Sequence, residues 1–240
     1  MTTSSAPFLS VVIPAYNEER RLPPTLGRVK QYLAVQDYPS EIMVVDNNSK
    51  DATAEVARKA GVTVLSEPRQ GKGIAVQTGM LAARGEYVLF SDADLSTPIE
   101  EVEKLMVALR AGHDIAIGSR ALPESNLPVR QPWYRELVGR AGNLLVRVMA
   151  VHGIADTQCG FKLFPRDIAR RLFGAQRMTG IAFDMEVLFL AQRLGLKIAE
   201  IPVTWIDNPD TRISRVRDSA DAIKDLIRIR ITWLLRRYRV

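Results

Sequence analysis

Short apolar runs rich in Val and Ile alternate along the chain with longer segments whose apolar residues recur at helical spacing. The first pattern is typical of buried β-strands and the second of amphipathic α-helices. Strands are predicted over residues 9–16, 41–46, 62–67, 86–92, 114–120 and 199–205. Helices are predicted over residues 18–35, 51–60, 73–84, 98–111, 134–150, 184–194 and 216–238. This alternation favours an α/β fold with a mostly parallel central sheet and flanking helices.

The length and composition favour one large domain. The chain has 240 residues, of which 47% are hydrophobic and 25% charged, as in an ordinary globular protein. We expect a flexible N-terminus over residues 1–8, a globular domain over 9–210 and a basic amphipathic C-terminal helix within 211–240. Residues 121–133 contain three prolines and predict a long loop, and loops of that length are often functional lids.

Several classes of protein are disfavoured by the composition. The single cysteine, Cys159, excludes an internal disulfide framework and fits a reducing compartment. The first residues lack a basic region and their apolar run ends at Pro14, so we expect no secretory signal peptide. No apolar run approaches the ~18 to 20 residues that span a bilayer.

The net charge of +6 is concentrated at the C-terminus. Residues 211–240 hold nine Lys and Arg against three Asp, which equals the excess of the whole chain. Apolar residues recur there at helical spacing, with Trp233 nearby: Ile223, Ile227, Ile231, Leu234 or Leu235, and Tyr238. This pattern predicts a helix that lies on an anionic membrane surface. Alternatively, the apolar stripe packs on the domain or docks on an integral membrane partner. No nucleic-acid recognition motif accompanies the basic tail.

Four of the predicted strands end in polar groups. They are Tyr16-Asn17-Glu18, Asp46-Asn47-Asn48, Asp92-Ala93-Asp94 and Ser119-Arg120. In open α/β sheets, ligands bind outside the carboxyl ends of the strands. We therefore expect these groups to converge on one crevice.

Two aspartates, Asp92 and Asp94, stand one residue apart at the end of an apolar run. In an extended chain they point to the same side, where Mg²⁺ or Mn²⁺ would relieve their repulsion. The basic Gly71-Lys72-Gly73 loop suggests that the ligand is a nucleotide diphosphate, which the metal ion and Lys72 would both contact. An alternative is a turn in which Asp92 bonds locally and Asp94 or Ser96 caps the next helix. A second alternative is the nucleophile motif of haloacid-dehalogenase-type phosphatases, although three predicted strands precede it here.

The order of the motifs resembles the family-two glycosyltransferases, which have the GT-A fold, a Rossmann-like nucleotide-diphospho-sugar transferase fold. The motifs are VVIPAYNEE, VVDNNSKDAT, RQGKGIAV, the DAD of residues 92–94, IAIGSRA, GIADTQCGFKLFPRD, AFDMEVLFLA and AEIPVTW. Over roughly residues 9–230 the chain closely resembles dolichyl-phosphate β-glucosyltransferases and the related polyprenyl-phosphate mannosyltransferases. The resemblance implies a metal-dependent, inverting hexosyltransferase that uses Mg²⁺ or Mn²⁺. UDP-glucose is the favoured donor, with GDP-mannose second, and a polyprenyl phosphate is the acceptor.

The resemblance implies a set of nucleotide-binding residues: Pro14, Ala15, Tyr16, Glu18, Asp46, Lys72 and Asp92. Tyr16 would pack on the base or ribose, and Glu18 would accept from ribose hydroxyls or cap the next helix. Asp46 would accept from an N–H of the base. Asn47 stands where relatives often carry a second acid, which puts any role of that acid in doubt here.

The same resemblance assigns the metal to Asp92 and Asp94. Ser96 replaces a glutamine of the mannosyl enzymes, which favours the glucosyl branch. The expected catalytic residues are Asp94, Arg120, Gln158 and Lys162. Asp184 and Glu186 would bind sugar hydroxyls, or would serve the dipole of the helix that they begin.

An anionic acceptor phosphate needs positioning and electrostatic stabilisation more than a strong general base. Arg120 is the first candidate to hold it, followed by Arg130 and Arg135, and then by Arg212 and Arg215. Each surface arginine taken singly is better explained by a solvated charge.

Two other functions stay open at this point: transfer to a soluble or glycan acceptor, and a non-catalytic nucleotide-sugar-binding subunit of a membrane complex. We expect a cytoplasmic protein that associates peripherally with the cytoplasmic face of a membrane. An integral membrane partner or a homo-oligomer is compatible with the tail.

Overall fold

The computed structural model describes residues 6–127, 151–206 and 215–239, with side chains in the last range described from Lys224 onward. Seven strands form one sheet in the order β3-β2-β1-β4-β6-β5-β7. The strands are β1 (Leu9–Ala15), β2 (Ser40–Asp46), β3 (Thr63–Ser66), β4 (Tyr87–Ser91), β5 (Ile115–Ser119), β6 (Phe161–Pro165) and β7 (Ile198–Pro202). Among the strands that the structure describes, only β6 runs antiparallel to its neighbours, so the predicted α/β class with a mostly parallel sheet is confirmed.

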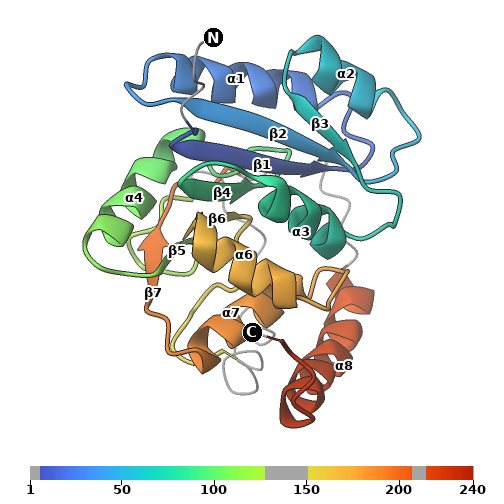
Figure 1. Cartoon of the computed structure of the whole chain (residues 1–240), viewed down its shortest axis with the longest axis vertical. Coiled ribbons are helices and arrows are strands. Elements are labelled where there is room, and N and C mark those ends of the chain that lie inside the picture. Colours follow the sequence, from blue (N-terminus) through green and yellow to red (C-terminus); the bar gives the residue numbers. More distant parts are fainter. Residues whose placement is uncertain (1–5, 128–150, 207–214, 240) are drawn as a thin grey trace.

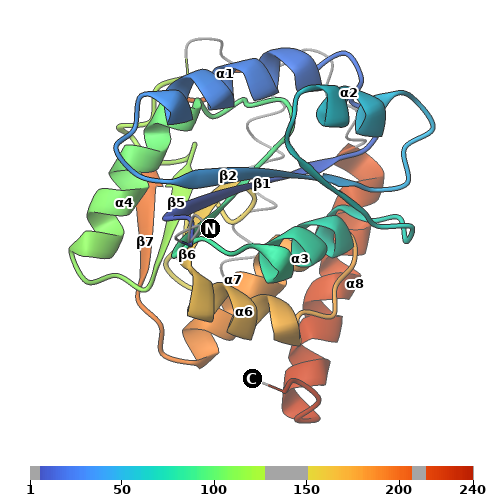
Figure 2. The same cartoon turned by 45° about the horizontal axis from the view of Figure 1, so that its top comes forward.

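Helices cover both faces of the sheet (Figures 1 and 2). The helices on one face are α1 (Leu22–Ala34), α2 (Thr53–Lys59) and α4 (Val102–Arg110). The other face carries α3 (Lys72–Ala82), α6 (Arg166–Ala175) and α7 (Phe183–Arg193), and α8 (Arg215–Leu234) packs against α7. Because both faces are covered, β1 is buried along its whole length, which explains why its sequence is apolar except at Ser10.

Two elements were absent from the prediction. β6 and α6 follow one another directly between residues 161 and 175, where the sequence pattern predicted neither a strand nor a helix. The strand is hard to recognise because Lys162 interrupts its apolar run, and this lysine is buried. The predicted helix over 134–150 lies outside the described residues.

The C-terminal helix forms as predicted but ends earlier, at Leu234. Leu226 and Ile229 are buried against the domain, while Ile227 and Ile231 are about half exposed. Tyr238 was predicted to belong to the membrane-facing stripe, and that prediction is wrong. It lies beyond the helix and is only 8% exposed, because its ring packs beside Trp233 and its hydroxyl binds Glu186.

In the part of the chain that the structure describes, no helix is both long and apolar enough to cross a bilayer.

Candidate functional site

The predicted residues gather at one edge of the sheet. β1 pairs in parallel with both β2 and β4, so the carboxyl ends of these three strands meet there. Asp46 is the last residue of β2, and Tyr16 and Asp92 directly follow β1 and β4. β6 enters from this same edge because it is antiparallel, and it brings Gly160 beside β4. The backbone N–H of Asp92 donates to the Gly160 carbonyl at 3.0 Å. The antiparallel strand thus delivers the Asp-Thr-Gln-Cys-Gly segment to the site.

Asp92 and Asp94 lie on a tight turn rather than on an extended strand. The backbone N–H of Leu95 donates to the Asp92 carbonyl at 3.2 Å, and Leu95 has a φ of 48°. The Asp94 carboxylate accepts from the Ser96 backbone N–H at 3.1 Å. The extended geometry assumed from the sequence is therefore wrong. The alternative predicted a turn here, but it gave the local bond to Asp92 and a helix cap to Asp94 or Ser96, whereas Asp94 makes the local bond and no side chain caps the following helical turn at Ile99–Glu101. Both side chains are nevertheless partly exposed at the sheet edge.

Lys72 forms an ion pair with Asp92, with 2.7 Å between Nζ and Oδ1. Lys72 is the first residue of α3, so the positive end of this helix also faces the site. Burial disfavours the charged ammonium, but the nearby carboxylates of Asp92 and Asp184 outweigh it, so the pKa of Lys72 is raised. The sheet edge therefore holds a fixed positive charge beside a carboxylate.

The loop that carries Lys72 lies tightly against the segment 178–180. Gly71 has a φ of 145°, and a Cβ there would lie 2.4 Å from the Thr179 carbonyl oxygen. A Cβ at Gly73 would lie 2.7 Å from the carbonyl oxygens of Met178 and Gly180. Glycine is thus required at both positions for the backbone to approach this closely.

Asn47 fastens the same loop to the end of β2. Its side-chain amide donates to the carbonyls of Glu67 and Arg69 at 3.2 and 2.7 Å, and its Oδ1 accepts from the Gly71 N–H at 2.8 Å. An aspartate could not donate to those two carbonyls. The residue that stands in place of a second acid therefore has a structural role in this chain.

A buried ion pair lies beneath the surface charges. Lys162 Nζ is 2.5 Å from Asp184 Oδ1 and 2.6 Å from the Cys159 carbonyl oxygen. The Phe90 ring lies near two ammonium groups, 5.5 Å from Lys72 and 5.8 Å from Lys162. Burial raises the pKa of Asp184 although both lysines act to lower it. Lys162 and Asp184 thus hold each other, which favours a positioning role over direct contact with substrate.

Arg120 is fixed by Asp156 rather than free in solvent. Its Nε and Nη2 atoms donate to the two carboxylate oxygens at 2.7 and 2.9 Å, and its guanidinium lies 5.5 Å from the Trp205 ring centroid. Asp156 is buried, which by itself raises its pKa, but the charge and hydrogen bonds of Arg120 lower it to about 2. A third of the Arg120 side chain is exposed, so Nη1 donors remain for an anion.

The other residues predicted for the site differ in exposure and in their hydrogen-bond partners. Tyr16 is 41% exposed, as packing on a base requires, while Pro14 and Ala15 are buried behind it. Gln158 is exposed on the loop beside Asp156. The Glu18 carboxylate is bound by Arg21 through both oxygens, a local partner that the sequence did not predict.

Glu186 does not face an open site. Its side chain is fully buried in the first turn of α7, where its two oxygens accept from the backbone N–H groups of Arg177 and Met178 and from the Tyr238 hydroxyl. These bonds contradict the prediction that Glu186 binds sugar hydroxyls, because its acceptor oxygens point into the protein.

The side chains of the remaining arginines predicted to hold the acceptor phosphate lie outside the part of the chain that the structure describes. Arg130, Arg135 and Arg212 lie outside the described residues, and the side chain of Arg215 does as well. Their predicted contact with an acceptor phosphate stays a prediction.

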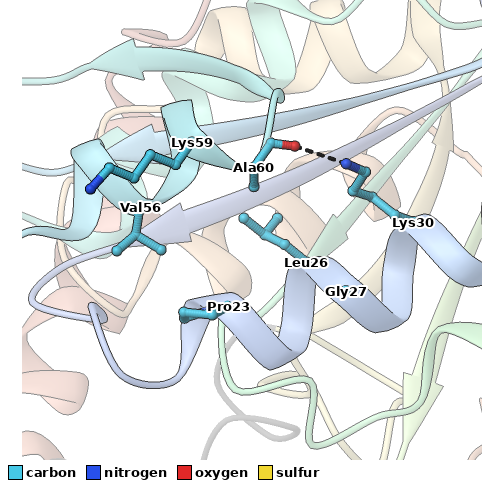
Figure 3. Close-up of a pocket in the computed structure, with 7 residues that line it drawn as sticks. All are labelled: Pro23, Leu26, Gly27, Lys30, Val56, Lys59 and Ala60. Atoms are coloured by element: carbon cyan, nitrogen blue, oxygen red, sulfur yellow. Dashed lines mark hydrogen bonds between the residues drawn. The ribbon is translucent and has the colours of Figure 1, made fainter.

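A hollow of about 370 Å³ lies between α1 and α2 (Figure 3). It is lined by Pro23, Leu26, Gly27, Lys30, Val56, Lys59 and Ala60. Lys30 Nζ donates to the Ala60 carbonyl at 2.9 Å across it. None of the lining residues belongs to the strand ends, so we assign the functional site to the sheet edge and not to this hollow.

The side chains at the sheet edge fit a divalent cation. Within the described residues no group of three or more His, Cys, Asp or Glu side chains could cage an ion. Two carboxylates are sufficient for Mg²⁺ or Mn²⁺, which keep water and phosphate ligands. Asp92 already binds one cation, the Lys72 ammonium, which shows that its carboxylate is accessible to a positively charged group.

Sequence reasoning missed three residues that shape the site: Asp156, which holds Arg120; Gly160, whose backbone contacts Asp92; and Trp205, which lies beside Arg120. A Cβ at Gly160 would lie 1.9 Å from Asp92 Oδ2. Asp156 and Gly160 belong to the Asp-Thr-Gln-Cys-Gly motif, which pointed to the right segment but not to these contacts.

Comparison with known proteins agrees with this geometry. The family model described as glycosyl transferase family 2 matches residues 10–173. A dolichyl-phosphate β-glucosyltransferase from Trichomonas vaginalis is 39% identical, over 95% of this chain and 74% of the relative. One from Homo sapiens is 37% identical, over 97% of this chain and 78% of the relative. The predicted resemblance is confirmed, and the phosphatase alternative is wrong.

Solved structures show the same fold. Glucosyl-3-phosphoglycerate synthase from Mycobacterium tuberculosis, in complex with Mn²⁺ and UDP-glucose, matches with a TM-score of 0.69 at 21% identity, over 92% of this chain and 78% of that one. Mannosyl-3-phosphoglycerate synthase from Rubrobacter xylanophilus matches with a TM-score of 0.74 at 20% identity, over 96% and 75%. The chain therefore belongs to glycosyl transferase family 2 and has the GT-A fold.

Proposed function

We propose that this chain transfers glucose from UDP-glucose to a polyprenyl phosphate of the dolichyl type, with inversion at the anomeric carbon. The observation that carries the reaction class is the Lys72–Asp92 ion pair at the edge where β1, β2 and β4 end. The choice of substrates is supported by the relatives named as dolichyl-phosphate β-glucosyltransferases, at 35–39% identity.

The donor nucleotide lies along the ends of β1 and β2 in this proposal. Tyr16 is exposed there and can pack on the base, and the Asp46 carboxylate can accept from the N–H of uracil. Lys72 and the N-terminus of α3 face the diphosphate. These groups bind the leaving half of the donor.

Asp92 and Asp94 are the residues that would hold Mg²⁺ or Mn²⁺. When bound, such an ion supplies positive charge to the diphosphate oxygens. Lys72 offsets the same developing charge, and its position beside Asp92 makes it available for this without a large movement.

The acceptor phosphate is placed by Arg120 on the other side of the sugar. One of its oxygens attacks the anomeric carbon and forms the new C–O bond, while the bond from that carbon to the UDP oxygen breaks and UDP leaves. The acceptor oxygen is already anionic, so no general base is required. Asp156 fixes the orientation of Arg120, so little conformational entropy of this side chain is lost when the acceptor binds. Gln158, exposed beside Asp156, is placed to contact the sugar or the acceptor.

The acceptor is a lipid, so the protein must reach a membrane surface. Ile227, Ile231, Leu234 and Leu235 form an exposed apolar face on and just after α8. Exposed arginines flank this face: Arg228, Arg236, Arg237 and Arg239. This combination fits anionic lipid headgroups over a shallow apolar layer. On this basis we propose that the enzyme lies on a membrane surface, and the single cysteine fits the reducing, cytoplasmic side.

The proposal is tested by incubating the purified protein with Mn²⁺ or Mg²⁺, a polyprenyl phosphate in detergent, and labelled UDP-glucose or GDP-mannose in parallel. Lipid-soluble label should form from UDP-glucose. Label from GDP-mannose alone would reassign the donor, and label on water-soluble acceptors alone would reassign the acceptor. Binding of UDP-glucose without transfer to any acceptor would support a non-catalytic subunit.

The Asp94→Ala variant should abolish transfer while the protein stays folded. Asp37→Ala serves as the control, because Asp37 is exposed just before β2, at the opposite edge of the sheet. Full transfer by the Asp94 variant would contradict the metal assignment.

A further inference from the structure

The buried carboxylate of Glu186 joins three parts of the chain that are distant in sequence. It lies in the first turn of α7, and its Oε2 accepts from the backbone N–H groups of Arg177 and Met178 at 2.9 and 2.8 Å. Its Oε1 accepts from the Tyr238 hydroxyl at 2.6 Å. One carboxylate thus holds the segment before α7 and the C-terminal tail together.

The tail makes further contacts at the same place. Trp233 packs edge-on against Phe189 of α7, with 5.9 Å between ring centroids, and it also lies beside the Tyr238 ring. The guanidinium of Arg177 lies 5.8 Å from the Tyr238 ring centroid and donates to the Arg237 carbonyl. The end of the chain therefore returns from α8 to the start of α7 (Figure 1).

The segment held by Glu186 is also the surface on which the Lys72 loop rests. Gln176 Nε2 donates to the carbonyls of Gly73 and Met178 at 2.9 and 2.8 Å. The backbone N–H of Ile74 donates to the Thr179 carbonyl at 3.1 Å. Because Gly71 and Gly73 have no room for a side chain against this segment, a shift of residues 176–180 must move the loop as well.

A continuous series of contacts thus runs from Tyr238 through Glu186 and Met178 to the loop that directs Lys72 at Asp92. We propose that Glu186 and Tyr238 are positioning residues for the donor diphosphate, acting through residues 176–180 on the Gly71-Lys72-Gly73 loop. This inference rests on the proposed function, since it assigns Lys72 to a diphosphate. Neither residue touches the donor.

The proposal differs from a purely structural role in what it predicts for binding. A hydrogen bond that only stabilises the fold changes the melting temperature but leaves the affinity of the folded protein for the nucleotide unaltered. A bond that positions Lys72 changes both. The decisive quantity is therefore the Kd for UDP in the presence of Mn²⁺, measured by titration calorimetry without any acceptor.

The Tyr238→Phe variant keeps the ring and removes only the hydroxyl. We expect its Kd for UDP and its KM for UDP-glucose to rise roughly three- to tenfold, and kcat to fall several-fold as well, because Lys72 also offsets the charge that develops on the leaving diphosphate. Tyr32→Phe is the matched control, because it removes a hydroxyl that donates to a carboxylate, Glu103, between α1 and α4. It should lower the melting temperature but leave the Kd for UDP unchanged.

A double-mutant cycle with Glu186→Gln tests whether the two residues act as one unit. If they do, the double variant binds UDP no more weakly than the worse single variant. Should Glu186→Gln fail to fold, Tyr238→Phe alone decides. If the wild type binds UDP and Tyr238→Phe binds it with the same Kd, the positioning role is overturned and the proposed function stays intact. A wild type that binds no uridine nucleotide would overturn both.

Discussion

At the scale of single residues, the proposed glucosyl transfer depends on the ion pair between Lys72 and Asp92. The ammonium lies 2.7 Å from the carboxylate, and both side chains are about a third exposed. Such a pair contributes little to stability on its own. In the proposed function, the pair keeps a positive charge at the position where the leaving diphosphate gains negative charge.

Replacing Lys72 by Met should therefore reduce activity without unfolding the protein. We expect kcat to fall by about 10²-fold, the usual size for removal of one charge-stabilising group. Lys59→Met is the control, since Lys59 forms an exposed ion pair with Glu55 on α2, away from the strand ends. Steady-state transfer of labelled glucose measures both variants. Equal loss of activity in both would argue against a specific role for Lys72.

At the scale of elements, β6 builds the site by bringing Gly160 against Asp92. The Gly160→Ala variant would place a methyl group 1.9 Å from Asp92 Oδ2 and must displace the carboxylate. We expect Mn²⁺ binding in the presence of UDP, followed by electron paramagnetic resonance, to weaken strongly.

The matched control is Gly174→Ala in α6, where a Cβ meets nothing within 4 Å. Alanine is a better helix former than glycine, so this variant should gain about 0.5–1 kcal/mol of stability and keep normal Mn²⁺ binding. Intact Mn²⁺ binding in Gly160→Ala would show that Asp92 is not a ligand.

The segment between β3 and α3 is stabilised by a buried carboxylate. The Arg69 side chain hydrogen-bonds Glu67, which is 4% exposed, and despite its burial the pKa of Glu67 falls from 4.5 to about 2. A depressed folded-state pKa adds stability above the unfolded value, and this stability is lost as the pH falls through the folded value. The contribution is at most about 3 kcal/mol, because Arg69 is largely exposed and its charge is screened by solvent.

Denaturant unfolding should accordingly show that the wild type loses its advantage over Glu67→Gln as the pH falls from about 4.5 to 2. The exposed Glu100, paired with Arg28, provides the comparison variant Glu100→Gln. A difference between wild type and Glu67→Gln that is constant over this pH range would contradict the assignment.

The sequence predicted the elements with strong periodicity and failed where charge was buried. The strands that end at Ala15, Asp46 and Ser91 were predicted within a residue, because both of their faces are apolar. β6 was missed because Lys162 lies in its apolar run, and its burial depends on the distant Asp184 carboxylate together with the Cys159 carbonyl. The paired aspartates were located correctly, but a turn that depends on a positive φ at Leu95 cannot be derived from spacing.

At the scale of the whole molecule, one end of the sheet carries the proposed donor site while α8 presents an apolar face outward. The Leu234→Asp and Leu235→Asp double variant should lose binding to vesicles that contain anionic phosphatidylglycerol, measured by co-sedimentation. Val107→Asp is the control, because Val107 is an equally apolar and 62% exposed residue on α4. Unaltered vesicle binding by the double variant would place the membrane contact elsewhere.

The central claim is that the acidic turn after β4 and the lysine that begins α3 together hold the pyrophosphate of the sugar donor. Crystals grown with Mn²⁺ and UDP-glucose test it most directly through the anomalous signal of manganese. The account predicts one peak bound by Asp92 and Asp94, with phosphate oxygens in its shell and the Lys72 ammonium moved from Asp92 onto the diphosphate. A peak remote from both aspartates, or a diphosphate that Lys72 does not contact, would contradict it.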